Sequence, residues 1–177
     1  YYRNGDTIFH AISNADWQYA ASNGIGAWSY YGNEAENGAI YGRLYNWFAV
    51  NDPRGLAPNG WRIATDNDWM ELEVELGMSQ SQAETFGWRG NPVGAKLAGT
   101  YDLWTNGVLR NHNLFNSSGF NGIPGGDRLS NGNFRDLGSY CYWWTSSENT
   151  SNNAVLRALG FINLDAFKGS ENKAMGR

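Results

Sequence analysis

Residues 51–69 read NDPRGLAPNGWRIATDNDW, and this stretch decides the local organisation because a turn-forming segment runs directly into a helix. Its first five residues are of the types that favour a reverse turn. Thr65 is then a good N-cap, and the carboxylates of Asp66 and Asp68 lie where the positive end of a helix dipole favours them. We therefore predict a helix that follows Thr65 and is closed by Gly77.

This predicted helix has an apolar face and an acidic face. Apolar side chains recur at positions i, i+3 and i+7, which places them on one side of a helix: Trp69, Leu72 and Leu76. Three acidic side chains are expected to face water, and we read them as a solvated surface rather than as catalytic acids: Glu71, Glu73 and Glu75.

Two further helices are predicted on either side of residue 30. Ser13 is an N-cap with Asp16 three residues later, which favours a helix over Ser13–Ser22. A third helical segment is expected over Gly42–Val50, with Leu44, Trp47 and Phe48 facing inward.

The pattern changes in the second half of the chain, where short apolar runs alternate with Gly, Asn and Ser clusters. Strands are predicted at 140–145 and 154–159, the second continuing through 161–164. The sequence thus predicts an α+β fold in one domain over residues 1–177. Helices lie mainly in its N-terminal half, and short antiparallel strands and long Gly/Asn-rich loops lie in its C-terminal half.

Composition narrows the classes of function. The 177 residues carry a net charge of −4, which argues against a surface that tracks nucleic-acid phosphates. No apolar run is long enough to cross a membrane. Aromatic residues make up 15% of the chain, and 23 glycines accompany 22 asparagines. This composition is typical of an ordered, loop-rich domain with an aromatic core and a polar, uncharged surface.

The sequence excludes several kinds of chemical site because it lacks the residues that they need. Cys141 is the only cysteine, so the chain has no internal disulfide and no multi-cysteine metal site, and we expect this thiol to be buried. His10 and His112 are too few for a histidine-rich zinc site. The segment 90–96 has glycines and a lysine, but it is one residue too short between the glycines for a phosphate-binding loop.

Aromatic and polar side chains between residues 140 and 153 are the strongest candidates for binding. Exposed Trp and Tyr rings stack on sugars, and Tyr140, Tyr142, Trp143 and Trp144 form the densest aromatic cluster. Strand alternation places the two tryptophans on opposite faces, so at least one is expected in the core. The loop 146–153 that follows is either a plain surface turn or a ligand or calcium loop, since calcium prefers oxygen ligands.

Six segments in order resemble the Fibrobacter succinogenes major paralogous domain family. They are YGRLYNW (41–47), the stretch 51–69, GAKL (94–97), NSSGF (116–120), PGGDR (124–128) and WWTSSE (143–148). The matched segments span most of the chain. One departure is Ala57, where the family carries a cysteine.

The resemblance implies a C-type-lectin-like fold in secreted or surface-anchored proteins of Bacteroidetes, Fibrobacter and their phages. Some proteins of that fold bind sugars through calcium with Glu-Pro-Asn or Gln-Pro-Asp and Trp-Asn-Asp motifs, which this chain lacks. Formylglycine-generating oxidases of similar fold need two cysteines. A third group, the variable proteins of diversity-generating retroelements, tolerates substitution in its C-terminal region, and the many asparagines here are compatible with adenine-targeted mutagenesis.

We therefore expect a non-enzymatic, extracellular or cell-surface recognition module that binds a glycan or a cell-surface protein. Its partners include no nucleic acid, it does not insert into a membrane, and no cofactor is expected, with calcium dependence left open. The fold analogy places the binding face on the C-terminal strands and loops: Tyr142, Glu148, Asn149, Asn152, Asn153, Arg157, Phe161 and Asn163.

Three other functions stay open at this point. The chain could be a variable adhesin or phage receptor-binding protein, or a structural module without a ligand of its own. An enzyme acting on polysaccharide would need two carboxylates facing each other across an aromatic cleft at roughly 5–9.5 Å. Because the sequence starts at Tyr1 without a methionine, we expect it to be part of a longer surface protein.

Overall fold

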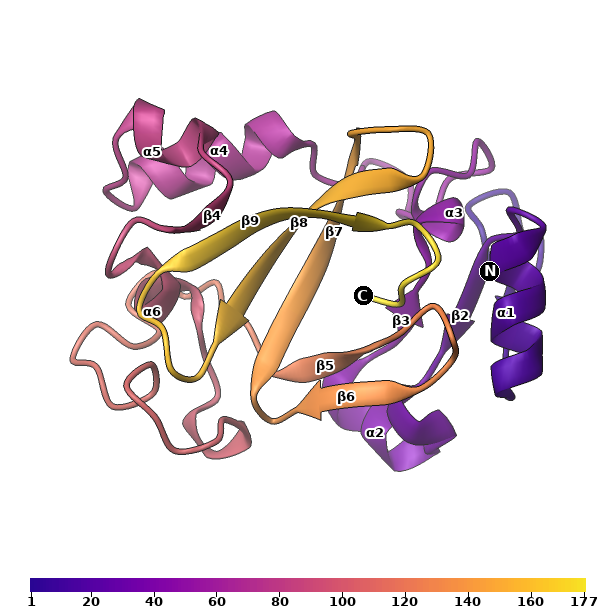
Figure 1. Cartoon of the computed structure of the whole chain (residues 1–177), viewed down its shortest axis with the longest axis horizontal. Coiled ribbons are helices and arrows are strands. Elements are labelled where there is room, and N and C mark those ends of the chain that lie inside the picture. Colours follow the sequence, from indigo (N-terminus) through magenta and orange to yellow (C-terminus); the bar gives the residue numbers. More distant parts are fainter.

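The computed structural model describes residues 1–177 and has the mixed α+β arrangement that the sequence predicts (Figure 1). Six α-helices precede residue 98: α1 (Asn14–Ser22), α2 (Ala35–Tyr41), α3 (Trp47–Val50), α4 (Asp66–Glu75), α5 (Gln80–Glu84) and α6 (Val93–Leu97). The strands form three sheets: β1 (Phe9–His10), β2 (Ala27–Ser29) and β3 (Leu44–Tyr45); β5 (Gly125–Arg128) and β6 (Phe134–Leu137); and β4 (Gly87–Arg89), β7 (Tyr140–Glu148), β8 (Asn153–Gly160) and β9 (Ala166–Asn172).

Both strongly predicted helices begin where their capping residues indicate. Thr65 and Asp68 form a reciprocal capping box at the start of α4, and Ser13 and Asp16 do the same for α1. Each box satisfies two backbone N–H groups that the first helical turn leaves without partners. The predicted helix starts are therefore confirmed.

The prediction of a helix over Gly42–Val50 was wrong in its first half. Leu44 and Tyr45 form strand β3, which pairs with β2, and only Trp47–Val50 is helical. Asn46 causes this change, because its side chain accepts a hydrogen bond from the N–H of Ala49 and caps α3. The same buried amide also bonds to the backbone just before and at the start of β2, so the residue joins a strand to a helix.

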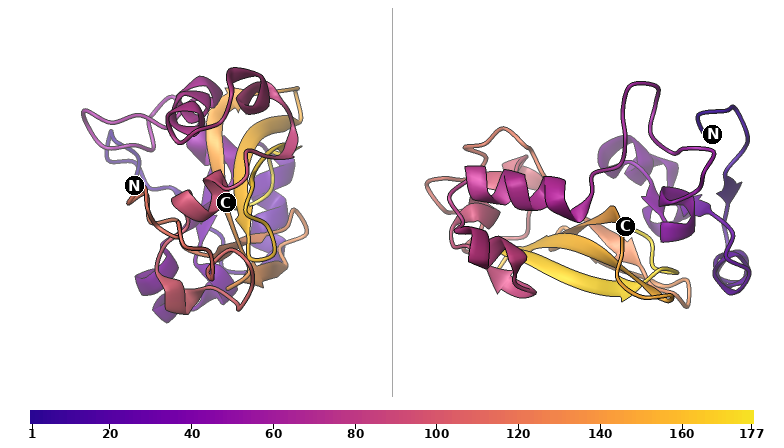
Figure 2. Two further views of the ribbon diagram at one scale, coloured as in Figure 1. Left: turned by 90° about the vertical axis from the view of Figure 1, so that its left-hand side faces the viewer. Right: turned by 90° about the horizontal axis from the view of Figure 1, so that it is seen from above.

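The largest sheet has the order β4-β9-β8-β7 and is antiparallel throughout. Helices α4 and α5 lie on one side of it (Figure 2). On the opposite side, called the free side below because neither helix covers it, Trp47 of α3 and Met175 share a buried cluster with Leu156 and cover part of the sheet. The predicted continuation of β8 through residues 161–164 was also wrong. The chain turns after Gly160, with the N–H of Asn163 donating to the carbonyl of Gly160, because β9 must return antiparallel to β8.

Most of the tryptophans have structural roles. Trp17 and Trp104 are fully buried, and each indole N–H donates to a backbone carbonyl. Trp144 is buried and Trp143 half-buried, on opposite faces of β7 as strand alternation predicts. Cys141 is buried as expected, and burial raises the pKa of its thiol well above the usual value.

A buried carboxylate joins α4 to the large sheet, contrary to the prediction that Glu73 faces water. Its side chain is fully buried and lies 2.8 Å from guanidinium nitrogens of both Arg89 on β4 and Arg157 on β8. Arg157 also lies 2.8 Å from Asp66, which in turn lies 2.9 Å from Lys168 on β9. These groups form one charged cluster between the helix and three strands.

The pKa values in this cluster follow from burial and charge. Burial lowers the pKa of Arg89, opposed by the nearby charge of Glu73. Burial by itself would raise the pKa of Asp66, but hydrogen bonds from Lys168 and Arg157 outweigh it and hold that pKa below the usual range.

None of the helices combines the length and the apolar character that a membrane crossing requires.

Replacing Glu73 with alanine should lower the free energy of unfolding by about 3–5 kcal/mol, because two buried guanidinium groups lose their shared partner. Denaturant unfolding measures this effect. Glu75→Ala is the matched control on the same helix, and since Glu75 is exposed and forms no hydrogen bond, it should shift stability by less than about 0.5 kcal/mol. Equal effects of the two substitutions would contradict the role of the cluster.

Candidate functional site

The free side of the large sheet carries a groove of about 180 Å³ that is lined mainly by aromatic side chains. The strand register explains how it forms. Tyr142 pairs with Ala158, Ala158 with Phe167 and Phe167 with Trp88, so these four residues make one row across all four strands. Because a small alanine lies among three aromatic residues, the row is hollow in its middle.

Glycine deepens this groove beside the row. Gly160 pairs with Tyr140, and a Cβ atom at Gly160 would lie 2.5 Å from the ring of Tyr140 and 3.2 Å from that of Trp88. The absence of a side chain at Gly160 therefore lets both rings lie over the strand.

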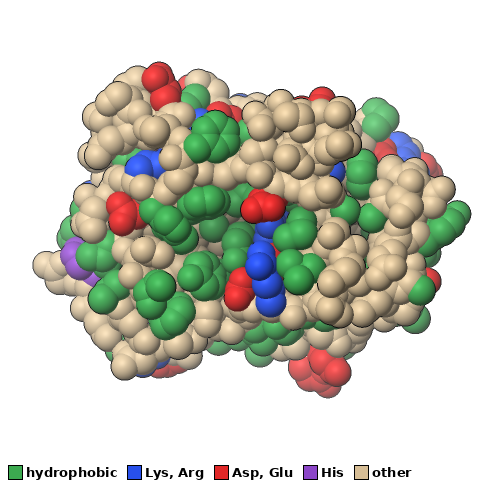
Figure 3. Space-filling model, viewed as in Figure 1, with side chains coloured by type: hydrophobic (Ala, Val, Ile, Leu, Met, Phe, Trp, Pro, Cys, Tyr) green, Lys and Arg blue, Asp and Glu red, His purple; other side chains and the backbone are tan.

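The rings form a continuous surface with one strongly exposed member. Trp88 is 39% exposed, and its ring centroid lies 5.1 Å from that of Phe167 and 6.5 Å from that of Tyr140. Tyr140 stacks on Tyr142 with 6.0 Å between centroids and 16° between planes. Figure 3 shows apolar side chains on this face around a short line of charged ones.

Charged side chains border the aromatic surface. Arg135 is about half-exposed and lies 3.0 Å from the buried carboxylate of Asp127, which also pairs with Arg177. The guanidinium of Arg177 lies 4.3 Å from the ring centroid of Tyr142. Glu171 is exposed and forms no hydrogen bond or ion pair, so its carboxylate is free to accept from a ligand.

Tyr142 is held at the border of the groove by its hydroxyl, which donates to Asp136 at 2.8 Å. Burial raises the pKa of Tyr142 above the usual range, and the charge of Asp127 and the hydrogen bond to Asp136 add to this effect. The phenol therefore stays protonated, and its ring keeps a fixed orientation.

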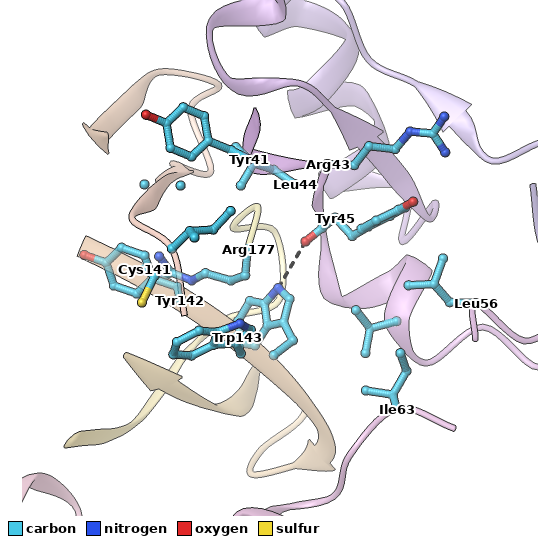
Figure 4. A pocket seen from close by; sticks show the side chains of 15 residues that line it. Tyr41, Arg43, Leu44, Tyr45, Leu56, Ile63, Cys141, Tyr142, Trp143 and Arg177 are labelled. Atoms are coloured by element: carbon cyan, nitrogen blue, oxygen red, sulfur yellow. Dashed lines mark hydrogen bonds between the residues drawn. The ribbon is translucent and has the colours of Figure 1, made fainter. Parts of the chain in front are cut away.

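A second hollow, of about 320 Å³, lies between β3, β5 and β7 (Figure 4). Its lining is mostly apolar, and the guanidinium of Arg43 points away from it toward Trp28, whose ring centroid is 4.2 Å distant. Side chains that line it include Tyr41, Leu44, Ile63, Ile123 and Trp143.

The structure does not bring the predicted binding residues together on one face. Tyr142 lines the groove, whereas Phe161 and Asn163 follow one end of β8 and the remaining surface residues surround its other end: Glu148, Asn149, Asn152 and Asn153. The eight residues of β8 separate these two groups by roughly 25 Å. Arg157 was wrongly placed on the binding face, since it is 1% exposed and fully engaged by Glu73 and Asp66.

The loop after β7 is a turn whose polar groups bond to one another and to nearby strands. Glu148 pairs with Lys173, and the amide of Asn149 donates to Ser170 at 2.9 Å. No group of three or more His, Cys, Asp or Glu side chains is placed to hold a metal ion.

Sequence reasoning missed four residues of the groove because they reach it from three strands far apart in the sequence: Trp88 on β4, Arg135 on β6, and Phe167 and Glu171 on β9. The alternation of Tyr140 and Tyr142 along β7 was a usable signal for one wall of the groove. Nothing local to Trp88 indicates that it lies beside Phe167, since that contact depends on the pairing of β4 with β9.

The family model of the Fibrobacter succinogenes major domain matches residues 1–176. The chain belongs to this family. No curated protein and no solved structure shows a significant match to it. The family description names no ligand or activity, so the groove has to be interpreted from its own chemistry.

Tyr142→Phe should lower the free energy of unfolding by about 1–2 kcal/mol, because it removes a hydrogen bond to a charged, partly buried acceptor. It should also remove an ionisation that lies above the usual range for tyrosine in an absorbance titration. Tyr19→Phe is the control for stability, since the Tyr19 side chain is exposed and its hydroxyl forms no hydrogen bond. Loss of one ionisation within the ordinary tyrosine range on Tyr142→Phe would show that the pKa of this phenol is not raised.

Proposed function

We propose that this chain is a non-enzymatic, extracellular recognition module that binds a glycan in the groove on the free side of the large sheet. The observation that carries the proposal is the row of Tyr142, Ala158, Phe167 and Trp88, which holds an exposed indole above a hollow that other aromatic rings line. The assignment to a C-type-lectin-like fold is part of the same proposal and rests on the family resemblance.

A sugar matches both parts of this site. Its C–H face packs against aromatic rings, and the exposed face of Trp88 offers such a surface. Its hydroxyls can donate to the free carboxylate of Glu171 and accept from the half-exposed guanidinium of Arg135. Pockets with an apolar lining and a few directed polar groups are the usual form of small-ligand sites.

Binding in this groove requires no calcium, because the aromatic surface and the polar groups are supplied by the chain itself. This distinguishes the proposal from a calcium-dependent lectin, in which oxygen ligands of the metal hold the sugar. The binding energy would come from Trp88 as the anchor, with Tyr140 and Phe167 supporting it.

A cell-surface protein is the second candidate ligand, and one observation favours it. Glu171 at one end of the groove pairs in register with Ala154, which in turn pairs with Glu148 beside the exposed turn of Asn149 and Asn152. A partner larger than a sugar could contact the groove and this turn together. The variable adhesin or phage receptor-binding protein belongs to this second candidate.

The test is binding of the purified chain to a glycan and polysaccharide array, with calcium and again with EDTA. We expect hits that survive EDTA and are weakened at least about tenfold by Trp88→Ala, as for an aromatic anchor at the centre of a contact. Trp61→Ala is the matched control, because Trp61 is 75% exposed and lies outside the groove. Loss of all hits in EDTA, or equal effects of the two substitutions, would overturn the proposal.

A further inference from the structure

The exposed carboxylate of Glu171 is the next side chain along β9 after an aromatic ring of the groove. Side chains alternate along a strand, so Phe167, Gly169 and Glu171 face the same side of the sheet. Gly169 has no side chain, and a Cβ atom there would overlap the ring of Phe167. That ring therefore leans along β9, over Gly169 and toward Glu171.

This arrangement leaves a short gap between the ring of Phe167 and the carboxylate of Glu171. Glu171 is two residues from Gly169, which corresponds to roughly 7 Å along a strand. Phe167 and Glu171 both line the groove, together with Trp88 and Tyr140. A cation in the gap would lie within about 6 Å of an aromatic ring, the range over which rings attract cations. It would also lie within hydrogen-bond reach of the carboxylate.

The charges around the groove also favour a cation. Arg135 lies 3.0 Å from Asp127 and 3.3 Å from Asp136. Arg177 pairs with Asp127 as well, so two guanidinium groups are matched by two carboxylates. Glu171 is a third carboxylate and forms no hydrogen bond or ion pair. The charged groups of the groove therefore carry one negative charge in excess, and a ligand with one positive charge balances it.

Arg135 provides a donor for a neutral part of the same ligand. Its Nε and Nη2 atoms donate to Asp127, at 3.0 and 3.1 Å, and its Nη1 atom forms no hydrogen bond. A sugar hydroxyl can accept from Nη1, whereas the side chain of a lysine has no acceptor. The groove is therefore better matched to a sugar that carries an amine than to a lysine side chain of a protein partner.

We propose that the glycan bound in this groove contains an amino sugar with a free, protonated amine. The inference rests on the function proposed above and names the class of sugar. The ammonium donates to Glu171 and lies against the ring of Phe167, while the C–H face of the sugar packs on Trp88. An N-acetylated sugar has no charge to place in the gap, because its nitrogen is part of an amide, and a neutral sugar has only hydroxyls.

The test uses three oligomers of equal length and linkage, which are built of glucosamine, N-acetylglucosamine or glucose. Isothermal titration calorimetry measures the affinity of each for the whole chain, at a pH at which the amine is protonated. We expect the glucosamine oligomer to bind at least about fivefold more tightly than the other two, because a cation–π contact and an exposed charge pair each add a modest attraction.

Glu171→Gln should abolish this preference and change the affinity for the glucose oligomer by less than about twofold, because glutamine keeps the shape and an acceptor oxygen but no charge. Glu75→Gln is the matched control, since it removes the same charge from the exposed surface of α4, outside the groove, and should leave the preference intact. The two variants separate a contact in the groove from the general attraction of a cationic oligomer to a protein of net charge −4.

A preference that survives Glu171→Gln, or that Glu75→Gln removes to the same extent, would overturn the inference. Equal binding of the three oligomers would also overturn it. A lysine oligomer that binds more tightly than the glucosamine oligomer, with the same dependence on Glu171, would assign the gap to a protein partner instead. The glycan array and Trp88→Ala test glycan binding separately, so this inference can fail while the proposed function stands.

Discussion

The buried carboxylate of Glu73 is the constraint on which the rest of the structure depends. It binds the guanidinium groups of Arg89 and Arg157 on two strands, and Asp66 on the same helix binds Lys168 on a third. Such a cluster is not chiefly a source of stability, because desolvation cancels much of the attraction, but losing one member leaves a buried charge without a partner. The ion pairs therefore fix which face of the sheet α4 covers.

The face of the sheet that α4 covers also determines which side chains lie on the opposite face. Side chains alternate across a strand, so fixing Arg157 toward α4 turns Ala158 to the free side, between Tyr142 and Phe167 in register. The groove is thus a consequence of residue size along one row. A larger side chain at Ala158 or Gly160 would fill it, whereas the aromatic residues give it walls and an exposed anchor in Trp88.

The features that the sequence predicts correctly are those encoded within a few residues. The capping boxes at Thr65 and Ser13 and the alternation of Trp143 and Trp144 are of this kind. The burial of Glu73 is not, because its partner arginines lie 16 and 84 residues away and an acidic residue between two others resembles a solvated face. The groove was unpredictable for the same reason, since Trp88 and Phe167 meet only through the pairing of β4 with β9.

Arg177 connects the groove to the sheet of β1, β2 and β3. Its side chain pairs with Asp127 and lies against the ring of Tyr142 at the border of the groove, while its backbone exchanges two hydrogen bonds with Tyr45 on β3. This backbone pairing holds the guanidinium that supports Tyr142. A border that is already ordered loses less conformational freedom when the groove binds a ligand, so the contacts with β3 favour binding in the groove.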